Sequence, residues 1–292
     1  MNIAIFGKIF NGNLIKYFQE LISKLEDNNC NLYFYKPFHE LVEHKVKFNS
    51  EVLFFSEHYE IKNKVDVLLS IGGDGTLLDT ITLIRDSNIP ILGINLGRLG
   101  FLSSVSKDEI STSMESVLNG NYSLDKRTLI KLETKENLFG DLNFALNELT
   151  IHKKDNPSLI VIHVSVDEHF LNSYWADGLI VSTPTGSTGY SLSCQGPIVA
   201  PGADNFIINP IASHNLTVRP IVIPDNSIIK INIEGRNKEF SLGLDSRFKT
   251  IDSSVELIIK KENFCINLIN MPEKDFFSTI REKLKWGLDV RN

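Results

Sequence analysis

The feature that most constrains the fold of this chain is a nearly unbroken apolar run, VDVLLSI (65–71), followed at once by the glycine-rich stretch GGDG (72–75). A run of this kind is typical of a central parallel strand that is covered on both faces. The next stretch, TLLDTITLIRDS (76–87), has a helical pattern. Strand, glycine loop and helix in this order predict a doubly wound α/β sheet with a ligand loop at the carboxyl end of the strand.

The rest of the first half has the same alternation of apolar runs and helical patterns. Residues 14–27 place five apolar side chains on one helical face: Leu14, Phe18, Leu21, Ile22 and Leu25. Three further apolar runs predict buried strands: NIAIFG (2–7), NLYFYK (31–36) and IPILGINL (89–96). We therefore expect an N-terminal α/β domain, residues 1–125, with a parallel Rossmann-like sheet.

The second half changes to short alternating strands. SLIVIHVSVDEHFLNSY (158–174) alternates around Asp167–Glu168, which predicts a β-hairpin. Further strands are expected within 219–224, 227–246 and 254–270. The sequence thus predicts an all-β, sandwich-like C-terminal domain over residues 126–270. The last segment, 271–292, has a helical pattern and is expected to pack back on the first domain.

Composition narrows the classes of function. The 292 residues carry a net charge of -6 without a long basic run, so nucleic-acid binding is not expected. No apolar stretch approaches the ~20 residues of a membrane span, and the N-terminus lacks a signal-peptide pattern. The three cysteines (Cys30, Cys194 and Cys265) lie far apart and have no zinc-site spacing. We expect a soluble, cytoplasmic protein with free thiols.

Asp74 lies inside the predicted glycine loop, where a helix N-terminus favours anions such as phosphate. Asp74 or Thr76 could simply cap the helix. Alternatively, the carboxylate orients an attacking hydroxyl and accepts its proton, or holds a metal that bridges phosphates. The P-loop pattern is missing, and Leu78 takes the third glycine position of a dinucleotide fingerprint. We therefore expect a loop that transfers phosphate.

A second polar loop lies in DGLIVSTPTGSTGYSLSCQGP (177–197). It combines many hydroxyl side chains with glycines and has no Lys or Arg. Such groups suit hydrogen bonds to ribose, base edges and pyrophosphate, and Tyr190 can stack on a ring. A Ser/Thr-rich surface loop is the alternative. The position directly after a buried strand favours a ligand loop.

Several polar residues outside these two loops are further candidates for ligand contacts. Asn147 and Glu148, within the apolar LNELTI (146–151), can read a ribose diol or an adenine edge, or lie at a solvent-exposed strand end. Asp177 is a ligand contact or a turn residue. Arg98 can meet phosphate or be solvated, and Asp79 reads as an exposed helical acid.

Together these segments resemble the NAD kinase family over most of the chain. The matching motifs are GGDGT (72–76), GINLGRLGFL (93–102), LNE (146–148), ADGLIVSTPTGSTGYSLS (176–193), GP (196–197) and RPIVIP (219–224). The resemblance implies that ATP phosphorylates the 2′-OH of the adenosine ribose of NAD, giving NADP, with a divalent cation such as Mg²⁺. It also implies an α/β domain followed by a β-sandwich-like domain, and a homo-oligomer, dimer or tetramer.

The resemblance assigns roles to individual residues. Asp74 would be the catalytic residue, as base or orienting acid, within a phosphate loop of Gly72, Gly73 and Gly75. The NAD-binding residues it implies are Asp74, Gly75, Asn147, Glu148, Asp177, Thr188, Gly189, Tyr190, Ser191, Leu192, Ser193 and Arg247. No residue is assigned as a metal ligand.

The chain departs from the family pattern at Trp175, Gln195 and Arg247, where Arg, Gly and Gln respectively are common. These changes bear on the fit of the dinucleotide and leave Asp74 untouched. Two other functions remain in competition. A GGDG-type lipid kinase shares the loop, but no strong basic amphipathic helix is present at either end. A non-catalytic dinucleotide-binding module would be expected to lose the acid, which this chain keeps.

Overall fold

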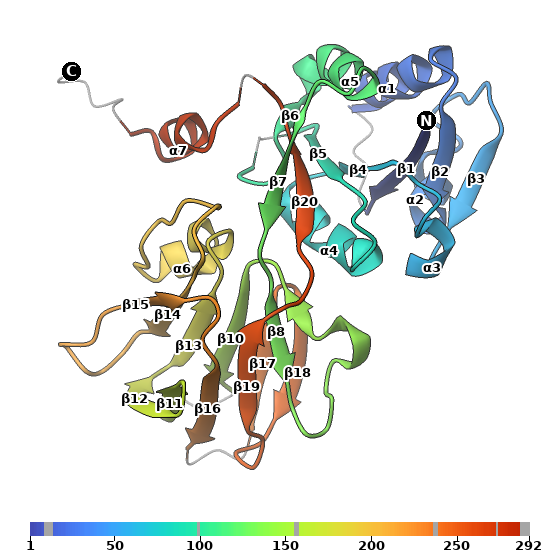
Figure 1. Ribbon diagram of the computed structural model, residues 1–292. Helices are drawn as coiled ribbons and strands as arrows, with labels where there is room; N and C mark the ends of the chain where they lie inside the picture. Colours follow the sequence, from blue (N-terminus) through green and yellow to red (C-terminus); the bar gives the residue numbers. More distant parts are fainter. Residues whose placement is uncertain (9–13, 98–99, 155–157, 236–238, 273, 287–292) are drawn as a thin grey trace. The chain divides into compact units, whose positions relative to one another are not determined.

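The computed structural model describes residues 1–8, 14–97, 100–154, 158–235, 239–272 and 274–286 (Figure 1). The chain divides into two compact units. Unit 1 contains residues 1–126 and 266–292, and unit 2 contains residues 127–265.

Unit 1 is built on an eight-stranded sheet in the order β3-β2-β1-β4-β5-β20-β7, with β6 pairing with β5. The pairs β1–β2, β2–β3, β1–β4 and β4–β5 are parallel. The strands are β1 (Asn2–Gly7), β2 (Asn31–Tyr35), β3 (Val52–Phe55), β4 (Val67–Ile71), β5 (Ile91–Asn95), β6 (Val105–Ser106), β7 (Ser123–Arg127) and β20 (Ile266–Asn270). This strand order confirms the predicted doubly wound sheet.

The helices of unit 1 are α1 (Ile15–Asp27), α2 (Lys36–Val42), α3 (His58–Ile61), α4 (Asp74–Ile84), α5 (Ile110–Leu118) and α7 (Phe276–Leu284). Helix α1 buries Phe18, Leu21, Ile22 and Leu25, as its sequence pattern predicts. All five residues of β4 are buried, which explains why all of them except Ser70 are apolar.

The last strand of the C-terminal half lies in a different sheet from the one expected. Residues 266–270 were expected in the β-rich domain, yet they form β20, where Leu268 pairs in parallel with Ile91 of β5. Residues from Ile266 onward accordingly belong to unit 1. An apolar pattern shows that a strand is buried but does not identify the sheet that receives it.

Unit 2 consists of two six-stranded sheets, in the orders β15-β14-β13-β10-β17-β18 and β12-β11-β16-β19-β8-β9 (Figure 1). The strands are β8 (Ile130–Glu133), β9 (Phe144–Ala145), β10 (Glu148–Lys153), β11 (Ile160–Val166), β12 (His169–Ala176), β13 (Gly178–Ser182), β14 (Asn205–Ile211), β15 (Ile221–Pro224), β16 (Ile229–Glu234), β17 (Phe240–Leu244), β18 (Arg247–Ile251) and β19 (Leu257–Lys261). A short helix, α6 (Tyr190–Ser193), follows β13. Every pair of neighbouring strands in these two sheets is antiparallel.

The two sheets of unit 2 share one apolar core. Leu149, Val181 and Leu242 come from the first sheet, and Ile162 and Ile231 come from the second. This arrangement confirms the predicted all-β, sandwich-like region. The β11–β12 hairpin also forms as predicted, with its turn at Asp167–Glu168.

Candidate active site

Asp74 is the first residue of helix α4, directly after β4 and the two glycines. The N-cap position is Gly73, and no side chain makes a capping hydrogen bond there. Capping by Asp74 or Thr76, one of the alternatives for this acid, is therefore wrong. The carboxylate has other partners.

Three backbone N–H groups from the segment after β5 hold the Asp74 carboxylate. Phe101 donates to Oδ2 at 2.7 Å, and Leu102 and Ser103 donate to Oδ1 at 3.0 Å each. The Ser103 hydroxyl also donates to the carbonyl oxygen of Gly72 at 3.1 Å. The loops that follow β4 and β5 are thereby fastened to each other, with Asp74 at their meeting point.

The glycines of this loop differ in what a side chain at each position would contact. Gly72 has a φ of +150°, and a Cβ atom there would lie 2.3 Å from Thr76 Oγ1. A side chain at Gly75 would meet nothing within 4 Å, so the face of the first turn of α4 is open. Free N–H groups at the start of α4 and this open face are the features that a phosphate group needs.

Two further predictions concern charged residues nearby. Asp79, on the same helix, pairs with Lys8, whose Nζ lies 2.8 Å from Asp79 Oδ2. Arg98 lies outside the described residues.

In unit 2, Asn147 and Glu148 lie at the start of β10, and Asp245 organises their backbone. Asp245 occupies the β17–β18 turn with a left-handed φ of 52°. Its carboxylate accepts the N–H groups of Leu146 and Asn147 at 2.8 Å and of Glu148 at 3.1 Å. The Asp245 N–H donates to the carbonyl oxygen of Glu148 at 3.0 Å. Asp245 thus fixes the backbone position of Asn147 and Glu148.

The Glu148 side chain is only 9% exposed. Its Oε2 atom, and Oδ1 of Asn147, have no hydrogen-bond partner among the described residues. Burial, with the charge of Asp245 second, raises the pKa of Glu148 to about 8. Burial also raises the pKa of Asp245, against the opposing effect of its three N–H donors and of the Arg247 charge.

The hydroxyl-rich loop after β13 returns to this pair. Thr183 Oγ1 donates to the carbonyl oxygen of Leu146 at 2.6 Å, and its N–H donates to that of Asn147 at 2.9 Å. A Cβ atom on Gly189 would lie 3.2 Å from Glu148 Oε2 and 3.4 Å from Asn147 Nδ2. The backbone of Gly189 therefore lies against both polar groups, and a side chain at this position would press on them.

Tyr190, the next residue, stacks on His152 with ring centroids 5.6 Å apart and an interplanar angle of 25°. The tyrosine is 38% exposed. Burial lowers the pKa of His152. Burial also raises the pKa of Tyr190, followed by the effect of Cys194 and then of the Asp177 and Glu148 charges. Asp177 forms an ion pair with Lys153 at 2.5 Å. These groups from β10, the β12–β13 junction and α6 therefore form one cluster.

The other predicted loop residues divide into internal and exposed groups. The hydroxyl of Thr188 donates to the carbonyl oxygen of Thr185 at 3.2 Å. Ser191 is buried, and its Oγ accepts from Asn209 Nδ2 at 3.2 Å. Ser193 is exposed and Leu192 is half-buried. Thr188 and Ser191 thus shape the loop, while Tyr190 and Ser193 present side chains to solvent.

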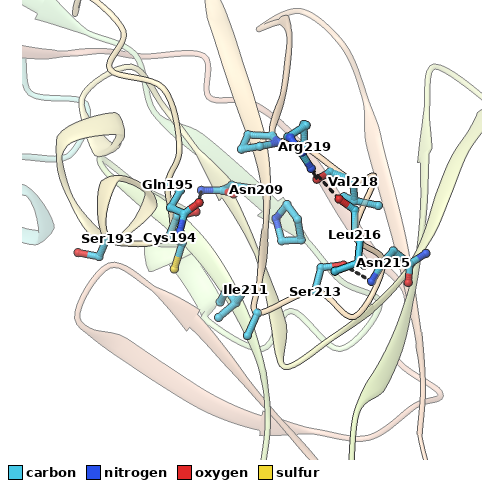
Figure 2. A pocket seen from close by; sticks show the side chains of 13 residues that line it. Ser193, Cys194, Gln195, Asn209, Ile211, Ser213, Asn215, Leu216, Val218 and Arg219 are labelled. Carbon is cyan, nitrogen blue, oxygen red and sulfur yellow. Dashed lines mark hydrogen bonds between the residues drawn. The ribbon is translucent and has the colours of Figure 1, made fainter.

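A pocket of ≈ 530 Å³ opens beside this loop (Figure 2). Ser193 and Gln195 line one side, and residues 209–213, 215–216 and 218–220 contribute lining from β14 and the segment before β15. Arg219 lies at its edge and donates from Nη1 to the carbonyl oxygens of Leu216 and Val218 at 2.8 Å each. Gln195, one of the departures from the family pattern, therefore borders a ligand-sized space.

Arg247, the other charged departure, has protein partners. Its guanidinium donates to the carbonyl oxygens of Leu142 and Phe144 and lies over the Phe144 ring, 5.4 Å from the centroid. Its side chain thus anchors the segment before β10. Trp175, the third departure, is 52% exposed on β12.

Within the described part of the chain, no group of three His, Cys, Asp or Glu side chains is placed to hold a metal ion. No helix in the same residues is long and apolar enough to cross a membrane.

The fold defines a two-unit protein, with a glycine–aspartate loop in its α/β unit and a cluster of polar side chains in its all-β unit. The model of the ATP-NAD kinase N-terminal domain matches residues 3–122, and that of the ATP-NAD kinase C-terminal domain matches residues 146–263. A NAD kinase of Cytophaga hutchinsonii is 48% identical over 293 residues, and one of Flavobacterium psychrophilum is 45% identical over 294 residues. Both alignments cover 100% of each chain. The chain belongs to the NAD kinase family.

Solved structures agree with this assignment. Yeast NADH kinase complexed with NADH superposes with a TM-score of 0.88 and 26% identity, covering 100% of this chain and 89% of that one. An NAD kinase from Archaeoglobus fulgidus in complex with ATP has a TM-score of 0.76 at 23% identity, covers 98% of this chain and 99% of that one, and supports the fold alone.

Sequence reasoning missed four residues that build these clusters: Gly100, His152, Asn209 and Asp245. Each acts through a partner distant in sequence, so local spacing carries little sign of it. The signals that were present are the second glycine of GRLG for Gly100 and the acid in the turn LDS for Asp245.

Proposed function

We infer that this chain is an NAD kinase that transfers the γ-phosphate of ATP to the 2′-OH of the adenosine ribose of NAD, producing NADP. The observation that carries the inference is the Asp74 carboxylate, held by three N–H groups at the N-terminus of α4, in a chain of this family. Phosphoryl transfer asks a protein mainly for positioning and charge compensation, with one group to orient the attacking hydroxyl. Asp74 supplies that group.

Phosphate handling belongs to unit 1 in this proposal. Gly72, Gly73 and Gly75 let phosphate oxygens approach the free N–H groups and the positive dipole end of α4. Asp74 accepts the proton of the 2′-OH or orients that hydroxyl. Its hydrogen bonds fix the direction in which the carboxylate points without neutralising its charge.

Dinucleotide recognition belongs to unit 2. Asn147 and Glu148 offer polar atoms that have no hydrogen-bond partner in the described part of the chain, and Tyr190 offers a ring face. Asp177, Thr188, Gly189, Ser191, Leu192 and Ser193 complete the proposed NAD-binding set, together with Arg247 and, from unit 1, Asp74 and Gly75. For Thr188, Ser191 and Arg247, whose polar groups bond within the protein, the proposed contribution is the shape of the site.

The residues present fit a Mg²⁺ ion that arrives with ATP. Mg²⁺ is commonly bound through substrate phosphates and one or two carboxylates, and Asp74 is a carboxylate at the phosphate loop. When bound, the ion would neutralise charge on the phosphates. We also propose that the protein is a cytoplasmic homo-oligomer, dimer or tetramer, that serves NADP biosynthesis.

The competing functions find no support. A GGDG-type lipid kinase would not share full-length identity of 48% with a NAD kinase. A non-catalytic dinucleotide-binding module would have no need to hold an acid at the phosphate loop, where Asp74 is bound by three donors.

The test is an end-point assay of purified protein with NAD, ATP and Mg²⁺, in which an NADP-specific dehydrogenase detects the product. We expect NADP from the wild type and a loss of roughly 10²–10⁴-fold in kcat for Asp74→Asn. This variant should still bind NAD, as measured by calorimetry. Asp79→Asn, on the same helix, is the matched control and should keep its turnover. Well-folded wild-type protein that makes no NADP would refute the proposal, and near-normal turnover in Asp74→Asn would refute the role of Asp74.

A further inference from the structure

The Glu148 carboxyl group is buried in a setting that does not favour its negative charge. It is 9% exposed, and its Oε2 atom has no hydrogen-bond partner among the described residues. No basic side chain of the described residues forms an ion pair with it. A buried carboxylate without donors is costly, whereas a buried carboxylic acid costs far less.

The neighbouring carboxyl group, that of Asp245, has the donors that Glu148 lacks. It accepts three backbone N–H groups, at 2.8, 2.8 and 3.1 Å. The charge of Arg247 also favours the Asp245 anion. Two carboxyl groups that interact electrostatically do not readily ionise together, so the charge belongs on Asp245 and the proton on Glu148.

The other titratable groups that face Glu148 do not change this balance. Tyr190 and Cys194 both interact electrostatically with Glu148, and burial raises the pKa of each side chain above its ordinary value. Both are therefore neutral near pH 7. His152 and Asp177 face Tyr190 from β10 and from the start of β13, and burial keeps His152 neutral as well.

The polar groups at positions 147 and 148 complement the edge of a base. The Gly189 backbone lies beside Glu148 Oε2 and Asn147 Nδ2, and Asn147 Oδ1 is a buried acceptor without a hydrogen-bond partner among the described residues. Tyr190, which follows Gly189, exposes part of its ring. The edge of adenine offers an amino donor beside a ring-nitrogen acceptor, which an amide oxygen and a carboxylic acid O–H complement.

We propose that Glu148 binds the dinucleotide as a neutral carboxylic acid and donates its hydrogen to a ring nitrogen of adenine. The proposal rests on the function proposed above and assigns Glu148 a donor role that an ionised carboxylate cannot fill. Its raised pKa, about 8, places the competing ionisation just above neutral pH. Free enzyme that has lost this proton must take one up to bind NAD.

Proton uptake is the decisive measurement, because it does not depend on turnover. NAD binding without ATP is followed by calorimetry at about pH 6 and about pH 9, in buffers of different ionisation enthalpy. We expect almost no exchange at the lower pH and uptake approaching one proton at the higher pH. Release of protons, or no exchange at the higher pH, would overturn the proposal.

Variants assign the proton to a residue. Glu148→Gln keeps a donor, so it should bind NAD within a few-fold of the wild type and lose the uptake. Glu262→Gln is the matched control, since Glu262 is also a glutamate of unit 2 with 9% exposure and should leave the uptake intact. Tyr190→Phe and Cys194→Ala should retain uptake, while Asp245→Asn should shift its onset to lower pH. Uptake that persists in Glu148→Gln would refute the assignment.

Analogues of NAD locate the acceptor. One of the analogues in which CH replaces an adenine ring nitrogen should bind about tenfold more weakly to the wild type, as expected for one lost hydrogen bond. It should bind to Glu148→Ala with no such penalty. Equal binding of all ring analogues by the wild type would overturn the adenine contact. Failure of these binding tests leaves NADP formation unaffected, so the two proposals fail separately.

Discussion

The backbone of Gly100 lies so close to Asp74 that a Cβ atom on the glycine would be 1.9 Å from Asp74 Oδ1. The three residues after Gly100 donate their N–H groups to the same carboxylate. The segment can approach Asp74 in this way only because residue 100 has no side chain. The orientation of the proposed catalytic carboxylate therefore depends on a glycine 26 positions further along the chain.

Gly100→Ala should displace either Asp74 or the segment that holds it. We expect kcat for NADP formation to fall by about 10²-fold, since misplacement of a reacting group by ~1 Å has effects of that size. The Michaelis constant for NAD should change less. Steady-state kinetics test this, with Gly202→Ala as control because a side chain there meets nothing within 4 Å. Unchanged kcat in Gly100→Ala would contradict the dependence.

The same pair shows what the sequence could and could not predict. GGDG after an apolar run predicted a loop between a buried strand and a helix, which β4 and α4 confirm, while the phosphate role of this loop stays a prediction. The N–H donors of residues 101–103 follow a different strand, so only the parallel pairing of β4 with β5 brings them to Asp74. Local spacing left a helix cap as an alternative for Asp74, and the contacts of its carboxylate with residues 101–103 show a different role.

Glu148 should make stability depend on pH. Its pKa is 4.5 ordinarily and about 8 in the folded chain, so the folded state favours the protonated form. The resulting stabilisation is present in full below about pH 4.5 and is lost as pH rises to about 8. The loss amounts to a few kcal/mol at most, since one pKa unit corresponds to about 1.4 kcal/mol.

Urea unfolding of the full-length protein without ligand, at several pH values, measures this dependence. Glu148→Gln cannot ionise, so its free energy of unfolding should decline less than that of the wild type between about pH 5 and pH 8. Glu262→Gln provides the comparison for a buried glutamate elsewhere in unit 2. Parallel curves for the wild type and Glu148→Gln would show that Glu148 is not protonated in the folded chain.

Asp245 should tolerate Asn better than Ala. Its φ of 52° suits Asn, whose carbonyl oxygen can still accept part of the three N–H groups. Ala leaves all three donors unpaired and strains the backbone, at a cost of about 1–3 kcal/mol for each buried group. We expect Asp245→Ala to lower Tm by several degrees and to raise the Michaelis constant for NAD more than Asp245→Asn does. Equal effects of both substitutions on Tm would argue against the hydrogen-bonding role.

The β-rich half illustrates a second limit of sequence reasoning. Alternating apolar residues were sufficient to predict the β11–β12 hairpin and the sandwich core. They were not sufficient to place residues 266–270, which join β5 in the other unit. Likewise, the motif that selected Ser191 as a ligand residue could not reveal that Asn209 bonds its hydroxyl, because that contact connects α6 with β14.

His152 should act on NAD binding through Tyr190. One face of the tyrosine ring is stacked on the histidine, 5.6 Å away, and the ring remains partly exposed. A ring supported in this way loses little freedom when a base stacks on its other face, so affinity should depend on the support as well as on the tyrosine. Tyr190→Ala should weaken NAD binding by about tenfold, and Tyr190→Phe should have little effect.

The support itself is tested at position 152. His152→Ala should weaken NAD binding by a few-fold, whereas His152→Phe keeps an aromatic partner and should restore it. Burial lowers the pKa of His152 below its ordinary 6.5, so the neutral ring stabilises the fold above that pH. This contribution is lost as pH falls through the lowered pKa. His152→Phe should therefore lose less stability than the wild type on acidification from about pH 6.5, which Tm measurements test. Calorimetry measures NAD binding by the same variants, and equal affinities of the wild type and His152→Ala would show that the stack contributes nothing.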